Sequence, residues 1–445
     1  MMPKMRMDTP AFRTLVFVAI FFTAFGIYVM RAVNSGALNQ PPEAGDGHDY
    51  DAIAFNVWQG RGFGYHWSDE AWRQPYVGIP RYRLLLTRKS EFYPTTYRPP
   101  AMPYLLSVVY ALTDRSFAAW RVLNCGIMAG GVTTAAVISA QFAGLPGAIL
   151  TTAITLRSRE LTRYSGMFMT ETLATFFVTL LAWAWMRNAR QGWSVGRAAS
   201  SGLIFGALIA SRTLFVPWTP LVLILPGRDT SFGSKFAWRT KAICLAMALL
   251  VMSPWFIRNI SVTNAFMPLG TQGGINLPMG FGPRAFRSQG IWASNPEDGW
   301  PEIAAQKLDI VTSEVMLAKY RSKLTIDWMM EHPSDVLELM RLHVWQEIRP
   351  RRDFLANWLL PVAALAVVFF RHSTGVWVIA LMVCATILSV AMTYSASGRF
   401  MVPVQPLLIA LVAALFMGVS SQAVSVAKRL RGRQGGAIAP DSPRP

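Results

Sequence analysis

The chain has 445 residues, of which 53% are hydrophobic and only 15% are charged, and its formal net charge is +18. Runs of about 16 to 25 apolar residues exclude a soluble globular protein and predict an all-α polytopic membrane protein. Its excess of Lys and Arg indicates cytoplasmic anchoring to anionic lipid, and no nucleic-acid partner is expected. The three cysteines all lie in apolar runs, which predicts neither a disulfide framework nor a zinc site.

The first apolar run, about residues 11–33, follows a basic N-terminus and lacks a small-residue cleavage site, which predicts a retained first span. It leaves the N-terminus in the cytoplasm and places residues 34–117 outside, as a large first extracytoplasmic loop with juxtamembrane helices. Within this loop, Ala101–Thr113 is apolar but short for a crossing and follows two prolines. It is predicted to be a surface or re-entrant helix.

The same loop contains an acidic and aromatic segment that runs from Gly45 to Pro100. Apolar residues recur in it with helical spacing, which predicts an amphipathic helix that ends at Gly60 and lies flat at the membrane surface. Such a helix holds an acidic cluster just above the lipid, and we interpret this arrangement as an active site at the membrane face. The apolar stripe is Tyr50, Ile53, Ala54, Val57 and Trp58, and the acidic cluster is Asp46, Asp49 and Asp51.

The remaining apolar runs predict nine further spans, or about ten in all, with a tight turn at Gly144-Leu145-Pro146-Gly147 after the second. Both termini and most basic clusters then lie in the cytoplasm, so the span count and the charges agree. We divide the chain into a transmembrane domain (1–427), which includes a second large extracytoplasmic segment (258–352), and a basic, disordered cytoplasmic tail (428–445). The further spans are about 118–142, 146–163, 167–186, 198–211, 213–226, 242–257, 354–370, 376–393 and 401–424.

Several motifs, taken in order, resemble a known family. They are DGHDYDAIAFNVWQGRGFGY, TYRPPAMPYLLSVVYAL, AAWRVLNCGIMAG, MTETLATFF, PWFIRN followed by MPLGTQGGINL, and GRFMVPVQPLL. Their order and spacing resemble the GT-C superfamily of polytopic membrane glycosyltransferases, in particular the bacterial branch related to protein O-mannosyltransferases and the lipid A aminoarabinose transferase.

The resemblance implies a GT-C fold and an enzyme that transfers a hexosyl or pentosyl group, with inversion, from a polyprenyl-phosphate carrier. The acceptor is a glycan, a lipid or a protein. The resemblance also implies the bacterial inner membrane of the cell envelope, with the active site facing the periplasm or exterior.

The chemistry of transfer calls for a carboxylate, because the acceptor hydroxyl must lose a proton as it attacks the anomeric carbon. In the resembled family the catalytic Asp lies four residues before a Tyr, and Asp46 precedes Tyr50 by that spacing. Asp46 is therefore the predicted base. Gly47 replaces the family's usual Glu, so Asp49 remains an alternative, and a simple helix cap remains the structural reading of both carboxylates. Glu171 matches the family's second acidic position, with an arginine-paired structural Glu as the alternative.

The donor phosphate calls for cations at the outer span ends, and arginine suits phosphate because its guanidinium donates in a fixed two-pronged geometry. Tyrosines are predicted to line the sugar pocket. The run Gly270–Asn276 is interpreted as an ordinary turn, and the alternative is a loop that brings backbone amides close to a ligand. The predicted substrate-binding residues are Tyr50, Tyr97, Arg98, Arg163, Arg212, Arg258 and Arg399.

The string Asp49-Tyr50-Asp51 is a DxD sequence, which in other glycosyltransferases indicates a divalent metal. Residues two apart on a helix point to different faces, so these two carboxylates cannot chelate one ion together. In a loop, His48 and Asp46 would be able to hold a metal together, but a solvated surface histidine is the favoured interpretation of His48. No metal and no other cofactor are expected.

Two other classes of protein remain open. One is a transporter or lipid flippase of the cell envelope, and the other is a non-catalytic membrane assembly protein. The sequence shows no inverted internal repeat of the kind that many transporters carry. Its outer segments are much longer than its inner loops, which favours chemistry on the outer face over alternating access.

Overall fold

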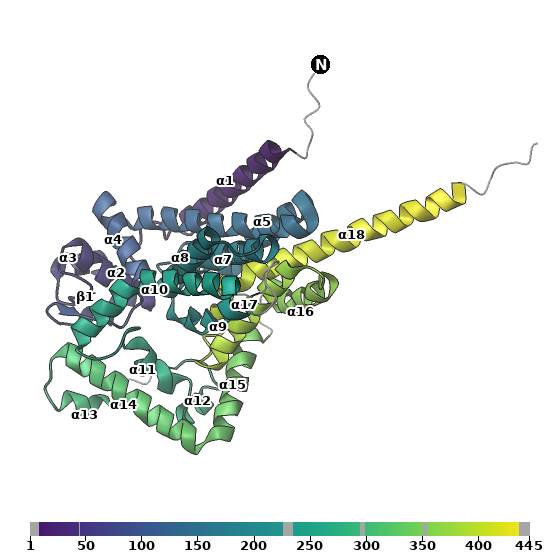
Figure 1. The fold of residues 1–445 in the computed structure, drawn as a ribbon. Coiled ribbons are helices and arrows are strands. Elements are labelled where there is room, and N and C mark those ends of the chain that lie inside the picture. Colours follow the sequence, from purple (N-terminus) through teal and green to yellow (C-terminus); the bar gives the residue numbers. More distant parts are fainter. Residues whose placement is uncertain (1–8, 44, 226–234, 294–298, 350–353, 436–445) are drawn as a thin grey trace, which may run out of the picture.

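The computed structural model describes residues 9–43, 45–225, 235–293, 299–349 and 354–435, which are almost entirely helical (Figure 1). Among these residues the one sheet pairs two short strands, β1 (Gly64–Tyr65) and β2 (Tyr93–Pro94). In the part of the chain that the structure describes, five helical segments are long and apolar enough to cross a membrane. The predicted all-α membrane protein is confirmed, while the count of ten spans stays a prediction. The five segments lie in α1 (Pro10–Asn34), α5 (Phe117–Arg157), α10 (Lys235–Thr263), α17 (Thr374–Ala391), and the 3₁₀ turn η6 (Arg399–Val404) with α18 (Gln405–Gly435).

Helix α5 covers two of the predicted spans. The backbone of Gly144 leaves the helical region at a φ of 63°, a left-handed conformation that glycine adopts without strain. Near the start of α5, Asn124 donates a hydrogen bond of 3.0 Å to the carbonyl of Tyr164, just beyond its end, so the second half returns alongside the first. The predicted turn is confirmed. The returning span ends earlier than predicted, because Ser158 breaks the helix and caps α6 (Arg159–Ser165).

The apolar body is built around α5, which contacts α1, α7 and α18. Its interior holds large buried side chains such as Trp185 and Trp218. Phe22, Leu250 and Val368 are exposed, which is the arrangement expected of residues that face lipid. The shorter elements of this body are α7 (Glu171–Gln191), α8 (Val195–Ser211), η4 (Thr213–Trp218), α9 (Thr219–Ile224) and α16 (Phe354–Phe369).

Helix α2 (Asp46–Trp58) confirms the predicted helix in the first outer loop but not its amphipathic exposure. A helix at a membrane surface keeps one polar face in water. Here every residue from Gly47 to Asn56 is buried. Trp72 and Tyr110 donate hydrogen bonds of 2.7 and 2.5 Å to Asp51, so protein groups replace water on that face. The rest of the loop contains α3 (Glu70–Arg73), η1 (Gln74–Tyr76), η2 (Pro80–Tyr82), η3 (Leu85–Thr87) and α4 (Ala101–Thr113), the last with the predicted bounds.

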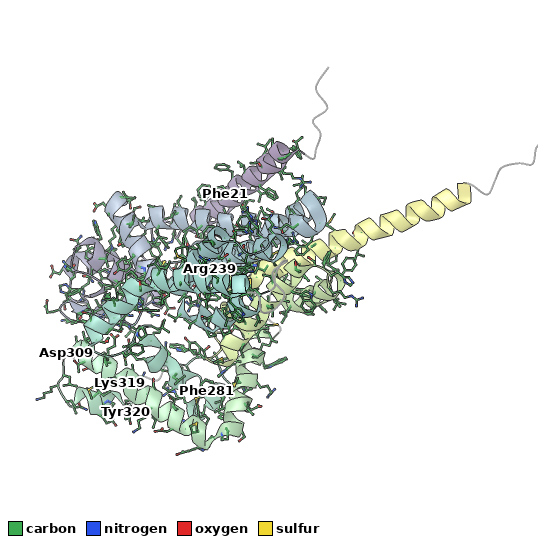
Figure 2. The ribbon with its side chains drawn as sticks, viewed as in Figure 1. Phe21, Arg239, Phe281, Asp309, Lys319 and Tyr320 are labelled. Carbon is green, nitrogen blue, oxygen red and sulfur yellow. The ribbon has the colours of Figure 1, made fainter. Side chains whose placement is uncertain are left out.

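The second outer segment forms a layer of helices in the lower part of Figure 1. Phe281, labelled in Figure 2, is buried beside Leu339, and its ring centroid lies 5.3 Å from that of His343. Lys319 and Tyr320, labelled on α14 in the same view, are exposed. The elements of this layer are α11 (Gln272–Asn276), η5 (Leu277–Met279), α12 (Pro283–Arg287), α13 (Trp300–Ala304), α14 (Ile310–Glu331) and α15 (Pro333–Ile348).

The free ends of the chain project away from this layer. In Figure 1 the N-terminal end of α1 and the C-terminal part of α18 both point away from α13 and α14. Because α18 continues to Gly435, the prediction of a disordered tail is wrong for residues 428–435. The rest of that tail (436–445), the end of the predicted span 213–226 and residues 350–352 of the second outer segment lie outside the described residues.

Candidate active site

A cavity of about 1450 Å³ is lined by the first outer loop, the second outer segment and the ends of several apolar helices. Segments far apart in the sequence contribute to it, from α2 to η6. Many aromatic and charged side chains lie in its wall. Among the described residues, its charged lining consists of the carboxylates Asp46 and Asp49 and the cations Arg88, Lys89, Arg98, Arg212 and Arg399.

Asp46, at the first turn of α2, lies between two arginines. Arg98 places Nη2 at 2.8 Å from Asp46 Oδ1 and at 2.6 Å from Asp49 Oδ2. Arg399 places its own Nη2 at 2.8 Å from Asp46 Oδ2. Both oxygens of Asp46 are therefore paired, and the predicted base and its alternative share one guanidinium.

Glu171 extends this network behind the cavity wall. It begins α7, is completely buried and does not line the cavity. Its Oε1 accepts from Arg212 Nη1 at 2.7 Å and also contacts Arg399 Nε. Glu171 thus holds two of the lining arginines from behind, which agrees with the arginine-paired reading of this residue. The ion-pair network consists of Asp46, Asp49, Glu171, Arg98, Arg212 and Arg399.

The network is balanced in charge, with three carboxylates and three guanidiniums among its members. Burial raises the pKa of Asp46, but the guanidiniums of Arg98 and Arg399 outweigh burial and hold that pKa well below its ordinary value. The Arg98 guanidinium lies over the ring of Tyr50. Burial raises the pKa of Tyr50 to about 12. The cavity therefore contains an ionised Asp46 beside a neutral phenol.

Two predicted arginines do not join this network. Arg258 donates to the carbonyl oxygens of Thr95 at 3.0 Å and Phe63 at 2.6 Å, which ties the end of α10 to the first outer loop. It does not line the cavity. Arg163 is exposed on α6, with its guanidinium 5.9 Å from the ring centroid of Tyr164, and it does not line the cavity either.

Arg88 and Lys89 are lining cations that sequence reasoning did not select. Arg88 lies 3.7 Å from Asp49 Oδ1 and 5.1 Å from the centroid of the Trp67 ring. Lys89 has no ion pair among the described residues. With the six-residue network balanced, these two side chains give the cavity its surplus positive charge. The available signal was a basic pair in an outer loop, where the positive-inside rule predicts few cations.

His48 also lines the cavity, and its prediction as a solvated surface residue is wrong. It is only 8% exposed, and its Nδ1 has no hydrogen-bond partner among the described residues. Burial lowers the pKa of His48, so the imidazole is neutral near pH 7. In the described part of the chain, no group of three His, Cys, Asp or Glu side chains has the arrangement to hold a metal ion.

The glycine-rich run belongs to the cavity wall rather than to an ordinary turn. Gly270 has a φ of 85°, and a Cβ there would lie 2.0 Å from the carbonyl oxygen of Thr96, so only glycine fits. The loop brings Asn276 to the cavity, where its Oδ1 accepts a hydrogen bond from Tyr97 at 3.3 Å. Tyr50 and Tyr97 both line the cavity.

The fold and this cavity together define a polytopic all-α membrane protein with a charged pocket at the ends of its apolar helices. No family model matches the chain, and no curated protein matches it. Several solved structures match the chain. The archaeal oligosaccharyltransferase AglB from Archaeoglobus fulgidus, in complex with an inhibitory peptide and a dolichol-phosphate, matches with a TM-score of 0.52 and 11% identity. The match covers 97% of this chain and 53% of that one, so the chain spans about half the length of AglB.

A second match is ArnT from Cupriavidus metallidurans bound to undecaprenyl phosphate, with a TM-score of 0.42 and 13% identity over 98% of this chain and 82% of that one. AglB and ArnT are both GT-C membrane glycosyltransferases. At these identities the likeness is one of fold, and the match to AglB carries it. The chain has the GT-C fold that its motifs predicted.

Proposed function

We propose that this protein is an integral-membrane glycosyltransferase that moves a sugar from a polyprenyl-phosphate carrier to an acceptor on the extracytoplasmic face. The observation that carries the proposal is Asp46, an ionised carboxylate held between Arg98 and Arg399 at a cavity large enough for a sugar phosphate. The fold supports the same conclusion, because the oligosaccharyltransferase that shares it was solved with a dolichol-phosphate.

In the proposed reaction an acceptor hydroxyl attacks the anomeric carbon of the donor from the side opposite the phosphate. The bond between that carbon and the phosphate oxygen breaks, and the lipid phosphate leaves with the electron pair. Asp46 takes the hydroxyl proton as the new glycosidic bond forms. Attack from the opposite side inverts the anomeric centre. The acceptor is a glycan, a lipid or a protein, and the sugar is a hexose or a pentose.

The ion pairs of Asp46 give donor binding a second role. A carboxylate whose pKa lies far below neutrality is a weak base. The donor phosphate competes with Asp46 for the guanidiniums of Arg98 and Arg399, and each ion pair that Asp46 loses raises its pKa. Asp46 is therefore a stronger base when the donor is bound and a weaker base in the empty site.

Sugar transfer from a radiolabelled polyprenyl-phosphate donor, with the purified protein in proteoliposomes, tests this function. Labelled sugar in the acceptor fraction supports the proposal. Uptake of a solute with no transfer from any tested donor would instead indicate a transporter or flippase. Neither activity, together with unchanged envelope assembly in Asp46→Asn cells, would indicate a non-catalytic assembly protein.

The surplus cations of the cavity predict where donor affinity arises. Arg88→Ala and Lys89→Ala are each expected to weaken the binding of undecaprenyl phosphate by about 10- to 150-fold, because a hydrogen bond to a charged group contributes roughly 1.5–3 kcal/mol. Dissociation constants of the purified variants in detergent measure this loss. Arg83→Ala is the matched control, since Arg83 is an exposed residue of the same loop that does not line the cavity. Wild-type affinity in both variants would show that the phosphate binds elsewhere.

The proposed orientation predicts which single cysteines an impermeant thiol reagent reaches in intact cells. In a background without the natural cysteines, Leu84→Cys and Lys319→Cys should react from outside, because both positions are exposed in the outer segments. Arg187→Cys, exposed near the opposite end of α7, should react only after the cells are permeabilised. The reverse pattern would place the cavity in the cytoplasm.

A further inference from the structure

A buried carboxylate of the second outer segment holds the loop that leads into Arg399. Glu347, on α15, is 4% exposed and lies outside the cavity wall. Its Oε2 accepts from Ser395 Oγ at 2.8 Å and from the Ala396 amide at 3.1 Å. Its Oε1 accepts from the amides of Phe400 at 2.7 Å and Met401 at 3.3 Å. These four donors flank Arg399 on both sides, so one carboxylate fixes the backbone from which that side chain extends.

A second carboxylate does the same for Arg98. Glu314, on α14, also lies outside the cavity wall. Its Oε2 accepts from Thr95 Oγ1 at 2.8 Å, and its Oε1 accepts from the Thr96 amide at 3.2 Å and the Thr96 hydroxyl at 3.2 Å. The hydroxyl of Thr271 also donates to Oε1. Glu314 thus fixes the two residues that precede Tyr97 and Arg98, and it ties them to the glycine-rich loop.

We propose that Glu314 and Glu347 are positioning residues that set Arg98 and Arg399 on either side of Asp46. Each carboxylate accepts several hydrogen bonds from a loop that carries one of these arginines, and hydrogen bonds to an ionised acceptor are the strong ones. Both residues belong to the second outer segment, whereas Asp46 and Arg98 belong to the first. The second outer segment therefore positions two arginines of the ion-pair network, through Glu314 on α14 and Glu347 on α15.

The arginines need such positioning because their side chains are long and the network depends on their placement. Ordering an arginine side chain costs rotamer entropy, and a displacement of about 1 Å at an active site lowers turnover by up to about 10²-fold. Because Glu314 and Glu347 fix the backbone beside Arg98 and Arg399, these two side chains lose less conformational freedom at each turnover. This consequence for turnover rests on the proposed function, while the positioning itself is a property of the folded protein.

Glu347→Gln and Glu314→Gln test the proposal, because the Gln amide can accept at one oxygen only and turns N–H groups toward backbone donors. The readout is the rate at which phenylglyoxal modifies individual arginines, followed by mass spectrometry of the purified protein. Arg399 should react roughly tenfold faster in Glu347→Gln, and Arg98 roughly tenfold faster in Glu314→Gln, the effect of losing one hydrogen bond to a charged group. Glu338→Gln on α15 and Glu331→Gln on α14, which remove more exposed carboxylates, are the matched controls.

Arg121, which is 1% exposed in the apolar body, reports whether each variant is folded. If Arg121 stays protected and the two network arginines react no faster than in the controls, the proposal is overturned. If a Gln variant exposes Arg121, the milder variants Ser395→Ala and Thr95→Val, which each remove a single donor, are judged by the same rates.

The rate of sugar transfer provides a second test of the proposal. The double variant Glu347→Gln/Arg399→Gln should transfer sugar no more slowly than Arg399→Gln alone, because Glu347 acts through Arg399. Additive losses would contradict this. Faster modification in variants of a protein that transfers no sugar would leave the positioning in place and reject the proposed function.

Discussion

Asp46→Asn is expected to lower turnover by about 10²- to 10⁴-fold, the usual effect of removing a general base, while donor binding survives. Asparagine keeps the size of the side chain and one accepting oxygen, but it cannot take a proton. Arg98 keeps Asp49 as a partner and Arg399 keeps Glu171, so the charge of each guanidinium stays paired. Single-turnover rates with saturating lipid-linked donor, together with the donor dissociation constant, separate the two effects. Near-normal turnover in Asp46→Asn would remove Asp46 from the chemistry.

Asp49→Asn is the comparison that the structure itself supplies. Asp49 shares Arg98 with Asp46 and lines the same cavity, so it has a similar charge environment. If Asp49→Asn abolishes turnover while Asp46→Asn preserves it, the base is Asp49. If both variants keep full activity, the two carboxylates serve only the helix terminus and the ion pairs.

The pH dependence follows from the same ion pairs. Activity that needs ionised Asp46 is present above its pKa and lost as the pH falls through that value. Because Arg98 and Arg399 outweigh burial and hold the pKa of Asp46 low, the acidic limb of kcat/KM, which reports the free enzyme, should lie below the ordinary Asp value of about 3.9. The acidic limb of kcat, which reports the donor complex, should lie at higher pH, because the phosphate takes over part of the arginine pairing.

Asp51→Asn is expected to destabilise the protein by about 3–5 kcal/mol, the usual cost of breaking a buried ion pair by removing one partner. Asp51 is completely buried and lies 2.7 Å from Arg115 Nη2. It also accepts hydrogen bonds from Trp72, Tyr76 and Tyr110. With a neutral Asn, Arg115 keeps its buried charge without a counterion, and three donors compete for one carbonyl oxygen.

Thermal unfolding of the purified variant, followed by tryptophan fluorescence, measures this loss as a lower Tm. Asp309→Asn is the control, since Asp309 caps α14 in an exposed position where Asn serves equally well. An Asp51→Asn protein that melts like the wild type but transfers no sugar would place Asp51 in the chemistry. It would also reopen the DxD reading, in which Asp49 and Asp51 act together.

Local patterns in the sequence predicted the helices well. The bounds of Ala101–Thr113 were predicted from apolar run length and the prolines before it, and the reversal at Gly144 from a Gly-Leu-Pro-Gly string. The exposure of α2 could not be predicted in the same way. Its cover comes from Trp72 and other aromatic residues of an irregular loop, whose position depends on tertiary contacts rather than on periodicity.

The arginine positions show the same limit at the site. Motif position selected Arg98, Arg399 and Arg258 equally, since all three fall in motifs that carry the family resemblance. The structure pairs the first two with Asp46, one of them across 353 residues of sequence, and gives Arg258 two backbone carbonyls instead. One sequence carries no signal for contacts at that range. Glu314 and Glu347 were missed for a further reason, because their partners are mostly backbone amides and hydroxyls, which leave no charge pattern to follow.

The close approach of Gly270 to Thr96 bears on how the protein moves. A single added carbon at position 270 would collide with the backbone of the first outer loop, so the two outer segments meet there without a gap. The Glu314 hydrogen bonds cross the same junction. A hinge motion between the two segments would have to break these contacts each time. If the protein is the proposed transferase, substrate exchange is therefore expected to leave this junction closed.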